Sequence, residues 1–136
     1  MKINIYFFII ANLIILSSCA RKNYLDKTVW MNVTPVEKDG VKGNIVNSVY
    51  FWDKKTISFY TAIEKDNSII VKPILVASGN YTYKGNIKKE AMVTANMVNY
   101  KNENLLYKGF VNPEGMVLVS PDSIAKGYNI SNITIK

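Results

Sequence analysis

The stretch Thr56-Ile57-Ser58-Phe59-Tyr60-Thr61-Ala62-Ile63 sets the pattern for the rest of the chain. Its odd-numbered positions are apolar apart from Thr61, and its even-numbered positions are mostly small or polar. This alternation has the period of a β-strand, in which successive side chains point to opposite faces of a sheet. The stretch therefore predicts a strand with one face in a core.

The segments on its N-terminal side have a similar composition. Residues 28–34 are rich in β-branched and aromatic side chains and stop at Pro35, which has no N–H to donate to a sheet. The pair Asp39-Gly40 is typical of a hairpin connection. We therefore expect a first strand at 28–34 and a second at 45–52.

The C-terminal side is more interrupted. Residues 68–77 are nearly continuous in Ile, Val and Leu, but Lys72-Pro73 interrupts them, which predicts an edge strand, a bulge or two short pieces. Glycine turns are expected at 78–80 and 84–86, flanking a short strand at 81–83. Such spacing favours a tight meander, in which each strand pairs with the one before it.

Residues 87–99 carry two competing patterns. Ile87, Ala91, Ala95 and Val98 would share one face of a helix, and several good helix formers lie among them. Residues 91–98 also alternate, with the apolar side chains at the odd positions on one side. We expect a strand here.

The end of the chain continues the pattern. A hairpin is expected from 105–111 and 116–119, and a last strand from 128–135. Eight or nine short strands with no convincing helix predict an all-β fold over residues 27–136. We expect a small antiparallel up-and-down barrel of about eight strands, because the last strand can close on the first and remove both edges. A two-sheet β-sandwich is the alternative.

Several short motifs carry a resemblance: Thr28-Val29-Trp30, residues 78–86, Gly109-Phe110-Val111 and Met116-Val117-Leu118. Together they resemble the small lipocalin-like lipoproteins of Gram-negative gut bacteria. The likeness covers most of the chain after residue 26, and it departs from true lipocalins in lacking their glycine-x-tryptophan start. Most members of that group have no assigned activity, so the resemblance implies a lipocalin-like barrel and not a reaction.

The N-terminus has the layout of an export signal. A basic start at Met1-Lys2 precedes an apolar run that is too short to cross a bilayer, since a spanning helix needs about 20 residues. The run ends in Leu16-Ser17-Ser18-Cys19, which resembles the lipobox of bacterial lipoproteins. That resemblance implies that residues 1–18 are a cleaved signal helix, that Cys19 is lipidated, and that 19–26 form a tether.

The lipobox also implies where the protein lies. Its partner would be a membrane of the cell envelope, reached through the lipid on Cys19. Residues 20–26 lack the acidic run that directs some lipoproteins outward, which favours the periplasmic face of the outer membrane over the cell surface. Cys19 is the only cysteine, so the domain folds without disulfides.

The charge of the chain argues against a nucleic-acid partner. The formal charge is +7, and removal of the leader with its one lysine leaves +6. All the cations of the exported part are lysines except Arg21, whereas phosphate and base recognition relies on arginine forks. Scattered lysines on a solvated surface are the simpler interpretation.

The sequence is also poor in catalytic groups. It has no histidine, and its one cysteine is assigned to lipid, so the usual general base, metal ligand and thiol nucleophile are missing. The carboxylates lie in or beside expected turns, as solvated loop charges do. We therefore expect no enzyme, no cofactor and no metal site.

The aromatic residues are the candidate ligand-binding residues. Trp30, Trp52, Tyr60, Tyr81 and Tyr83, together with Tyr50 and Tyr107, could line a pocket inside the barrel, although core packing is the commoner role of aromatic residues in small barrels. Asp122-Ser123-Ile124 is similar to an O-glycosylation motif of some Gram-negative gut bacteria, which makes Ser123 a candidate modification site.

These observations favour a non-enzymatic binding module at the cell envelope that holds a small apolar or glycan ligand. The alternative is a protein-interaction or structural lipoprotein with a packed interior and no small ligand, whose partner is another envelope protein.

Overall fold

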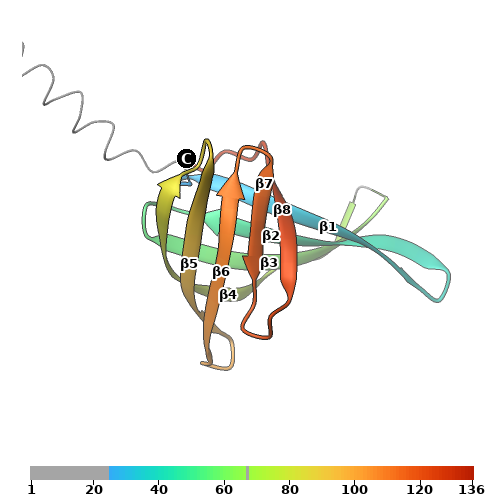
Figure 1. Cartoon of the computed structure of the whole chain (residues 1–136). Helices are drawn as coiled ribbons and strands as arrows, with labels where there is room; N and C mark the ends of the chain where they lie inside the picture. The colour runs from blue at the N-terminus through green and yellow to red at the C-terminus, as the bar shows by residue number, and fades with distance from the viewer. Residues whose placement is uncertain (1–24, 67) are drawn as a thin grey trace, which may run out of the picture.

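A computed structural model describes residues 25–66 and 68–136, and in these residues the chain forms eight β-strands and no helix (Figure 1). In chain order the strands are β1 (Thr28–Lys38), β2 (Val41–Phe51), β3 (Thr56–Lys65), β4 (Ser68–Asn86), β5 (Glu90–Asn99), β6 (Asn104–Asn112), β7 (Gly115–Val119) and β8 (Ala125–Ile130).

The strands form one closed antiparallel barrel in simple chain order. Each strand pairs with the next, and β8 returns to β1 through the pairs Trp30 with Ile130 and Met31 with Asn129. Beside this seam the side-chain amide of Asn32 donates to the carbonyl of Gly127 at 2.8 Å. The expected up-and-down barrel is confirmed, and the two-sheet alternative is not what the chain forms.

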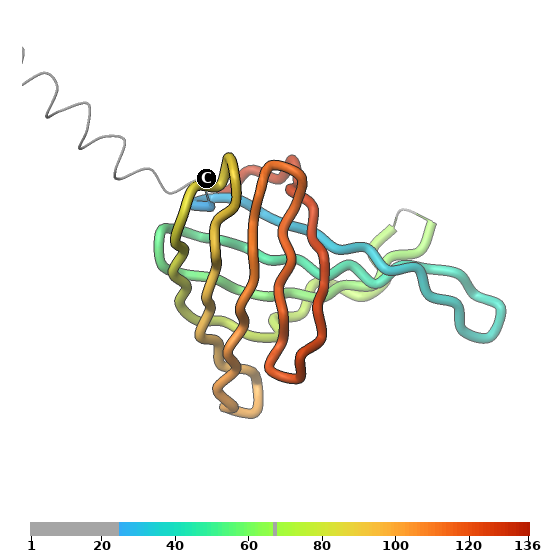
Figure 2. The backbone as a smooth tube through the Cα atoms, in the orientation of Figure 1, coloured from blue at the N-terminus to red at the C-terminus, as the bar shows by residue number. Residues whose placement is uncertain are grey.

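The barrel is flattened into two layers whose strands cross (Figures 1 and 2). Strands β5 to β8 run side by side in one layer, and β1 to β3 run across them in the other. Strand β4 bends from one layer into the other, so its first half pairs with β3 and its second half with β5. The space between the layers is therefore the interior of the barrel.

Apolar side chains from every strand fill that interior. The alternation of the sequence places one face of each strand inward, as Phe51, Ile57 and Val93 illustrate with no exposed surface. The buried cluster consists of Leu25, Trp30, Val49, Phe51, Ile57, Phe59, Ala77, Tyr81, Ala91, Val93, Ala95, Met97, Val111, Met116, Leu118 and Tyr128. The barrel centre is thus a packed core.

Two strands run further than the sequence indicates. β1 was expected to stop at Pro35 but continues to Lys38, because the outer part of β1 pairs only with β2 and Pro35 lies on an open edge, where a missing N–H costs little. The turn to β2 is formed by Asp39 and Gly40, both with positive φ, as the Asp-Gly pair predicts.

β4 is a single strand of 19 residues where two or three pieces were expected. Its register against β3 shifts at several points around Lys72-Pro73, which absorbs the proline. Gly79 lies inside the strand and makes no turn. A Cβ at Gly79 would lie 1.9 Å from the carbonyl oxygen of Asn96 on β5, so the glycine permits a close approach of two backbones.

The ambiguous segment 87–99 contains β5, as expected for a strand. The last strand covers Ala125–Ile130 and not 128–135, since β8 begins directly after the loop that follows β7. The backbone N–H of Ser131 still donates to the carbonyl of Val29 at 2.8 Å, which places the C-terminal end beside the start of β1 (Figure 1).

The outer halves of β1 to β4 leave the barrel as an extension that we call the arm, residues 33–44, 62–66 and 68–75 (Figures 1 and 2). In the arm β1 has no β8 beside it, and β4 meets β5 only from Ala77 onward. The arm is therefore a four-stranded sheet with no second layer among the described residues, and both of its edges are open.

The described chain begins inside the core. Leu25 is fully buried, and its carbonyl accepts hydrogen bonds from the backbone N–H and the hydroxyl of Thr28, at 3.1 and 2.6 Å. Leu25 falls in the segment 19–26 that we assigned to a tether, so the packed domain starts two residues before the boundary expected from the sequence. The leader and Cys19 lie outside the described residues.

Candidate functional site

A pocket of about 310 Å³ opens at the end of the barrel where the loop between β7 and β8 lies, which we call the mouth pocket. Ligand sites in barrels are commonly found at such openings, and this volume is at the small end of their range. Its lining consists of Asn47, Ser48, Phe59, Tyr60, Val76, Tyr107, Leu118, Ser120, Asp122, Ile124, Lys126 and Tyr128.

The floor of the mouth pocket is the top of the packed core. Leu118 and Tyr128 are buried, and the rings of Phe59 and Tyr107 meet edge to face with their centroids 4.8 Å apart. These side chains come from both layers of the barrel, and they close the interior behind them. A ligand can therefore sit in the mouth but finds no channel through these side chains.

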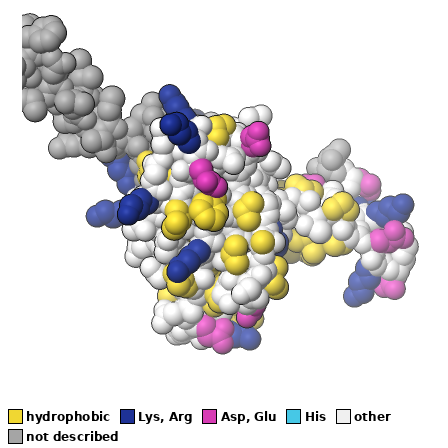
Figure 3. Space-filling model, viewed as in Figure 1, with side chains coloured by type: hydrophobic (Ala, Val, Ile, Leu, Met, Phe, Trp, Pro, Cys, Tyr) yellow, Lys and Arg dark blue, Asp and Glu magenta, His cyan; other side chains and the backbone are white. Residues whose placement is uncertain are grey.

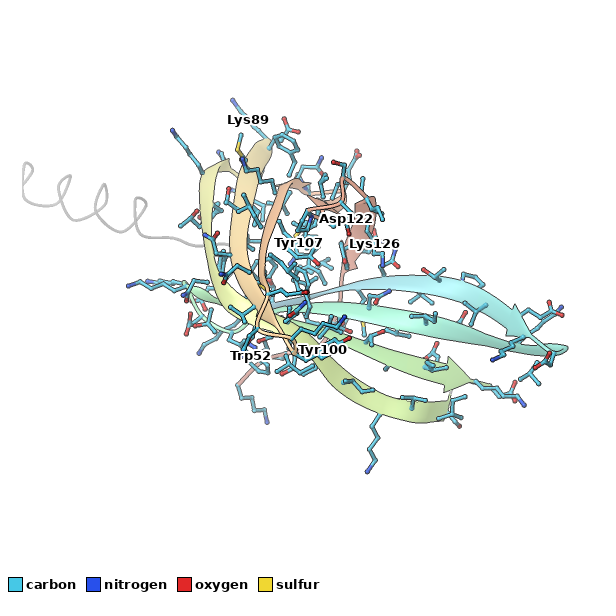
Figure 4. All side chains as sticks on the ribbon, turned by 90° about the horizontal axis from the view of Figure 1, so that it is seen from below. Trp52, Lys89, Tyr100, Tyr107, Asp122 and Lys126 are labelled. Atoms are coloured by element: carbon cyan, nitrogen blue, oxygen red, sulfur yellow. The ribbon has the colours of Figure 1, made fainter. Side chains whose placement is uncertain are left out.

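The loop between β7 and β8 builds the rim. The Ser120 hydroxyl accepts a hydrogen bond from the backbone N–H of Ile124 at 3.2 Å, and the Ser123 N–H donates to the Ser120 carbonyl at 3.0 Å. These bonds fold the loop into a compact turn with Asp122 on it. Tyr107, Asp122 and Lys126 lie around the same opening in Figure 4.

Lys126 reaches the pocket because of its register. It pairs with Leu118 across β7 and β8, so the two side chains share the inward face of the barrel. Lys126 is half-buried, and the next inward residue along β8 is Tyr128. Lys126 thus adds a cationic side chain to a pocket that Tyr128 also lines, on the same side of the barrel wall as the core.

Two tyrosines of the mouth pocket, Tyr107 and Tyr128, have raised pKa values. Burial, with a smaller contribution from the Asp122 carboxylate, raises the pKa of Tyr107. Burial, assisted by Tyr107, raises the pKa of Tyr128 to about 12. At neutral pH both hydroxyls are therefore neutral groups that can donate or accept a hydrogen bond, and neither is poised as a base or a nucleophile.

The five aromatic residues singled out from the sequence do not come together in one place. Trp30 and Tyr81 are buried in the core, and Tyr83 packs against it. The indole N–H of Trp30 donates to the Thr28 hydroxyl at 2.9 Å, and the Tyr81 hydroxyl donates to the Asp53 carbonyl at 2.7 Å. Each of these two polar groups is thus satisfied within the protein.

Trp52 and Tyr60 lie instead on the outer face of the sheet, in an aromatic cluster with Tyr50. Tyr50 stacks on Trp52 at a centroid distance of 5.0 Å and meets Tyr60 edge to face at 5.1 Å. The indole N–H of Trp52 donates to the buried Ser58 hydroxyl at 3.0 Å. Tyr60 borders the mouth pocket, but its ring lies with this cluster on the face of β3 opposite to Phe59.

The polar residues of the mouth pocket were not singled out from the sequence. Asn47, Ser120, Asp122 and Lys126 come from two layers of the barrel, and only the closed fold brings them together. Asp122 was interpreted as a solvated loop charge, and nothing in the local sequence distinguishes it from the other acidic loop residues. Tyr107, by contrast, is one of the aromatic residues named as pocket candidates, with core packing as the favoured role, and it both lines the pocket and packs against the core.

Ser123, the candidate modification site, lies on the rim. It is exposed, has a φ of 62°, and belongs to the tight turn that carries Asp122. Among residues 25–66 and 68–136 no group of acidic, histidine or cysteine side chains is arranged to hold a metal ion. The same residues contain no helix long and apolar enough to cross a membrane.

No family model, no curated protein and no solved structure matches this chain.

Proposed function

We propose that this protein is a non-enzymatic, lipid-anchored lipoprotein of the cell envelope, lipocalin-like in fold, that binds a small sugar-like ligand in the mouth pocket. The observation that supports this proposal most directly is the composition of the pocket, in which aromatic side chains form the floor and polar groups of both charges stand at the rim. The apolar C–H faces of a sugar ring can pack on the aromatic floor, and its hydroxyl groups can form hydrogen bonds with the polar rim.

The packed interior favours a glycan over an apolar ligand. A fatty acyl chain would need a deep apolar cavity, and the barrel centre behind Phe59 and Leu118 is filled by core side chains. A single sugar ring needs only the mouth. Asp122 would accept hydrogen bonds from its hydroxyl groups, and Asn47 could donate to them and accept from them. The charge-assisted bonds to Asp122 would contribute about 1.5–3 kcal/mol each.

The experiment is calorimetric titration of the chain from Ala20 onward, which contains every described residue, with glucose, galactose, N-acetylglucosamine and decanoate as probes. We expect at least one sugar to bind and decanoate not to bind. The variants Asp122→Asn and Tyr107→Phe should weaken sugar binding by about tenfold or more, or about 1.4 kcal/mol.

Two matched variants serve as controls. Glu114→Gln changes a carboxylate in the turn between β6 and β7, at the other end of the barrel, and Tyr100→Phe changes an exposed tyrosine outside the pocket. Both should bind sugar as the parent does. If no sugar binds, or if Trp52→Ala abolishes binding while Asp122→Asn does not, the mouth pocket is not the site.

The second candidate function is a protein-interaction role without a small ligand. The filled barrel interior and the apolar side chains exposed on the arm favour it. An absence of binding by all four probes, together with an intact fold, would favour this second function over the first.

A further inference from the structure

The outer face of β1 to β4 is an unpaired surface of the arm that carries exposed apolar side chains. The registers place Met31, Ser48, Tyr60 and Leu75 in one row across the four strands. Two rows further out on the same face, the same registers place Pro35, Asn44, Glu64 and Ile69 side by side. We call this surface, together with the aromatic cluster of Tyr50, Trp52 and Tyr60, the outer apolar face.

Large apolar side chains on this face are open to solvent. Ile69 is 60% exposed, Val33 53% and Leu75 48%, although each lies on a well-formed strand. Sheets in folded domains ordinarily bury such a face against a second layer, and the arm has none among the described residues. The face is therefore suited to packing against another molecule.

The two open edges of the arm are protected from strand addition. Pro35 lies on the β1 edge and Pro73 on the β4 edge, and each removes a backbone N–H that an added strand would need. A partner of the arm is therefore expected to pack on its face and not to extend its sheet.

The charges of the arm identify the kind of partner. The arm carries four lysines and four carboxylates, Lys38, Lys42, Lys65, Lys72, Glu37, Asp39, Glu64 and Asp66, and most of them gather near its tip (Figure 3). The other described residues carry ten lysines and six carboxylates. The basic character of the protein thus lies outside the arm, which is neutral.

The registers place Glu37, Lys42 and Glu64 on the outer apolar face, so this face carries charges of both signs and can face a copy of itself. In a two-fold symmetric dimer each patch meets the same patch, so a surface of one sign would repel its partner, whereas alternating signs can pair. Glu37 and Lys42 already lie opposite each other in register on β1 and β2. The same neutrality gives the arm no attraction for an anionic membrane surface.

We propose that a second copy of this chain packs on the outer apolar face, so that the protein forms a symmetric dimer through its arms. Trp52, Tyr50 and Tyr60 provide the aromatic anchors that dominate many interfaces. The apolar residues of the arm continue that interface, as is common in homodimers. Ser48 and Tyr60 of this face also border the mouth pocket, but Ile69 and Leu75 do not, so substitutions at Ile69 and Leu75 test the dimer without changing the ligand site.

The test is sedimentation velocity of the chain from Ala20 onward across a wide range of concentration, with the double variant Ile69→Thr/Leu75→Thr beside it. Threonine keeps the preference for a strand but is polar, and both sites are exposed, so the fold should survive. We expect a dimer for the parent chain and at least a tenfold weaker association for the variant.

The matched control lies on the other layer. Phe110 and Val117 are paired across β6 and β7, and they are 49% and 44% exposed on the outside of the barrel. Phe110→Thr/Val117→Thr removes a comparable apolar patch and should leave the dimer intact. If the dimer of this control variant dissociates while that of the arm variant does not, the dimer forms through β6 and β7 and not through the arm, and the proposal is overturned.

Charge reversal supplies a second test. Lys38→Glu/Lys42→Glu makes the arm acidic and Glu37→Lys/Asp39→Lys makes it basic, so each variant alone should dissociate, while an equal mixture of the two should associate again. A monomeric parent chain at all concentrations would overturn the proposal, as would binding of the monomer to phosphatidylglycerol vesicles that Ile69→Thr/Leu75→Thr abolishes. Sugar binding by these variants, measured separately, reports on the mouth pocket alone.

Discussion

The arm continues four of the eight strands of the barrel and follows the same alternation, but the two regions differ in what lies across from their sheet faces. Val49, Phe51 and Ile57 in the barrel halves of β2 and β3 are buried by the crossing layer, while Val36 and Ile74, on the same face of the sheet in the arm, are 36% and 55% exposed. The pattern of a strand therefore says which side chains share a face. Whether that face is buried depends on a second layer, which is a property of the whole topology.

The first test of this comparison adds a side-chain carbon at a glycine in the barrel where the backbones of two strands lie close together. A Cβ at Gly79 would lie 1.9 Å from the Asn96 carbonyl oxygen, whereas nothing lies within 4 Å of one at Gly127. We expect Gly79→Ala to destabilise the fold by about 3 kcal/mol or more, because backbone must move, and Gly127→Ala to have little effect. Urea unfolding measures both, and equal stability of the two variants would contradict the close approach.

The second is to truncate one apolar side chain in each region. Leu25→Ala should cost about 2–5 kcal/mol, since it empties a fully buried site in the core. Ile69→Ala, on the exposed face of the arm, should change the unfolding free energy of the monomer by about 0.5 kcal/mol or less. Chemical denaturation at a dilution that disfavours association compares the two, and a similar loss for both would mean that the arm is as well packed as the barrel.

The third test uses the pH dependence of stability to examine the burial of Tyr128 in the mouth pocket. Burial raises the pKa of Tyr128 to about 12 from its ordinary value of 10.0, so the folded state keeps the proton that the unfolded state loses. The resulting stabilisation is complete below pH 10.0 and disappears as the pH rises through about 12, a change on the order of 2 kcal/mol. Denaturation at several alkaline pH values should show a larger decline in the parent than in Tyr128→Phe, which keeps only the contribution of Tyr107, while the exposed Tyr100→Phe should behave as the parent.

The smallest expected effect on stability is at the edge of the arm. Pro73→Val should alter the unfolding free energy by roughly 1 kcal/mol at most, because the site is exposed and the register is already shifted there. It restores a donor on an open edge, so we expect faster growth of insoluble aggregates, measured by light scattering. Pro113→Val, in the turn between β6 and β7, is the control, and equal aggregation of both variants would show that the edge needs no protection.

The sequence predicts the barrel well because barrel strands repeat one local rule. The alternation in residues 56–63 and 91–98, the Asp-Gly turn and the short connections each follow from side-chain period and turn chemistry. The errors fall where a distant strand decides the outcome. Gly79 is a turn signal by itself, and it becomes a strand residue because β5 passes close to it.

Local sequence patterns do not predict the mouth pocket or the arm, and the physical reason is the same for both. Asn47 and Lys126 lie far apart in the chain, and they meet because β8 turns back against β1 and closes the sheet. The arm exists because β1 to β4 are longer than their partners on either side. Both features depend on relative strand lengths and on registers across the whole sheet, which no single segment encodes.

The burial of Leu25 limits how far the domain can stand from its proposed anchor. Only five residues separate Cys19 from Leu25, and even fully extended the six steps between them span about 20 Å. If Cys19 carries the lipid, the end of the barrel that holds Leu25 must face the bilayer at short range. The opposite end, with Asp122 and Lys126 at its opening, would then point into the aqueous space, where a water-soluble sugar could reach it without crossing the lipid surface.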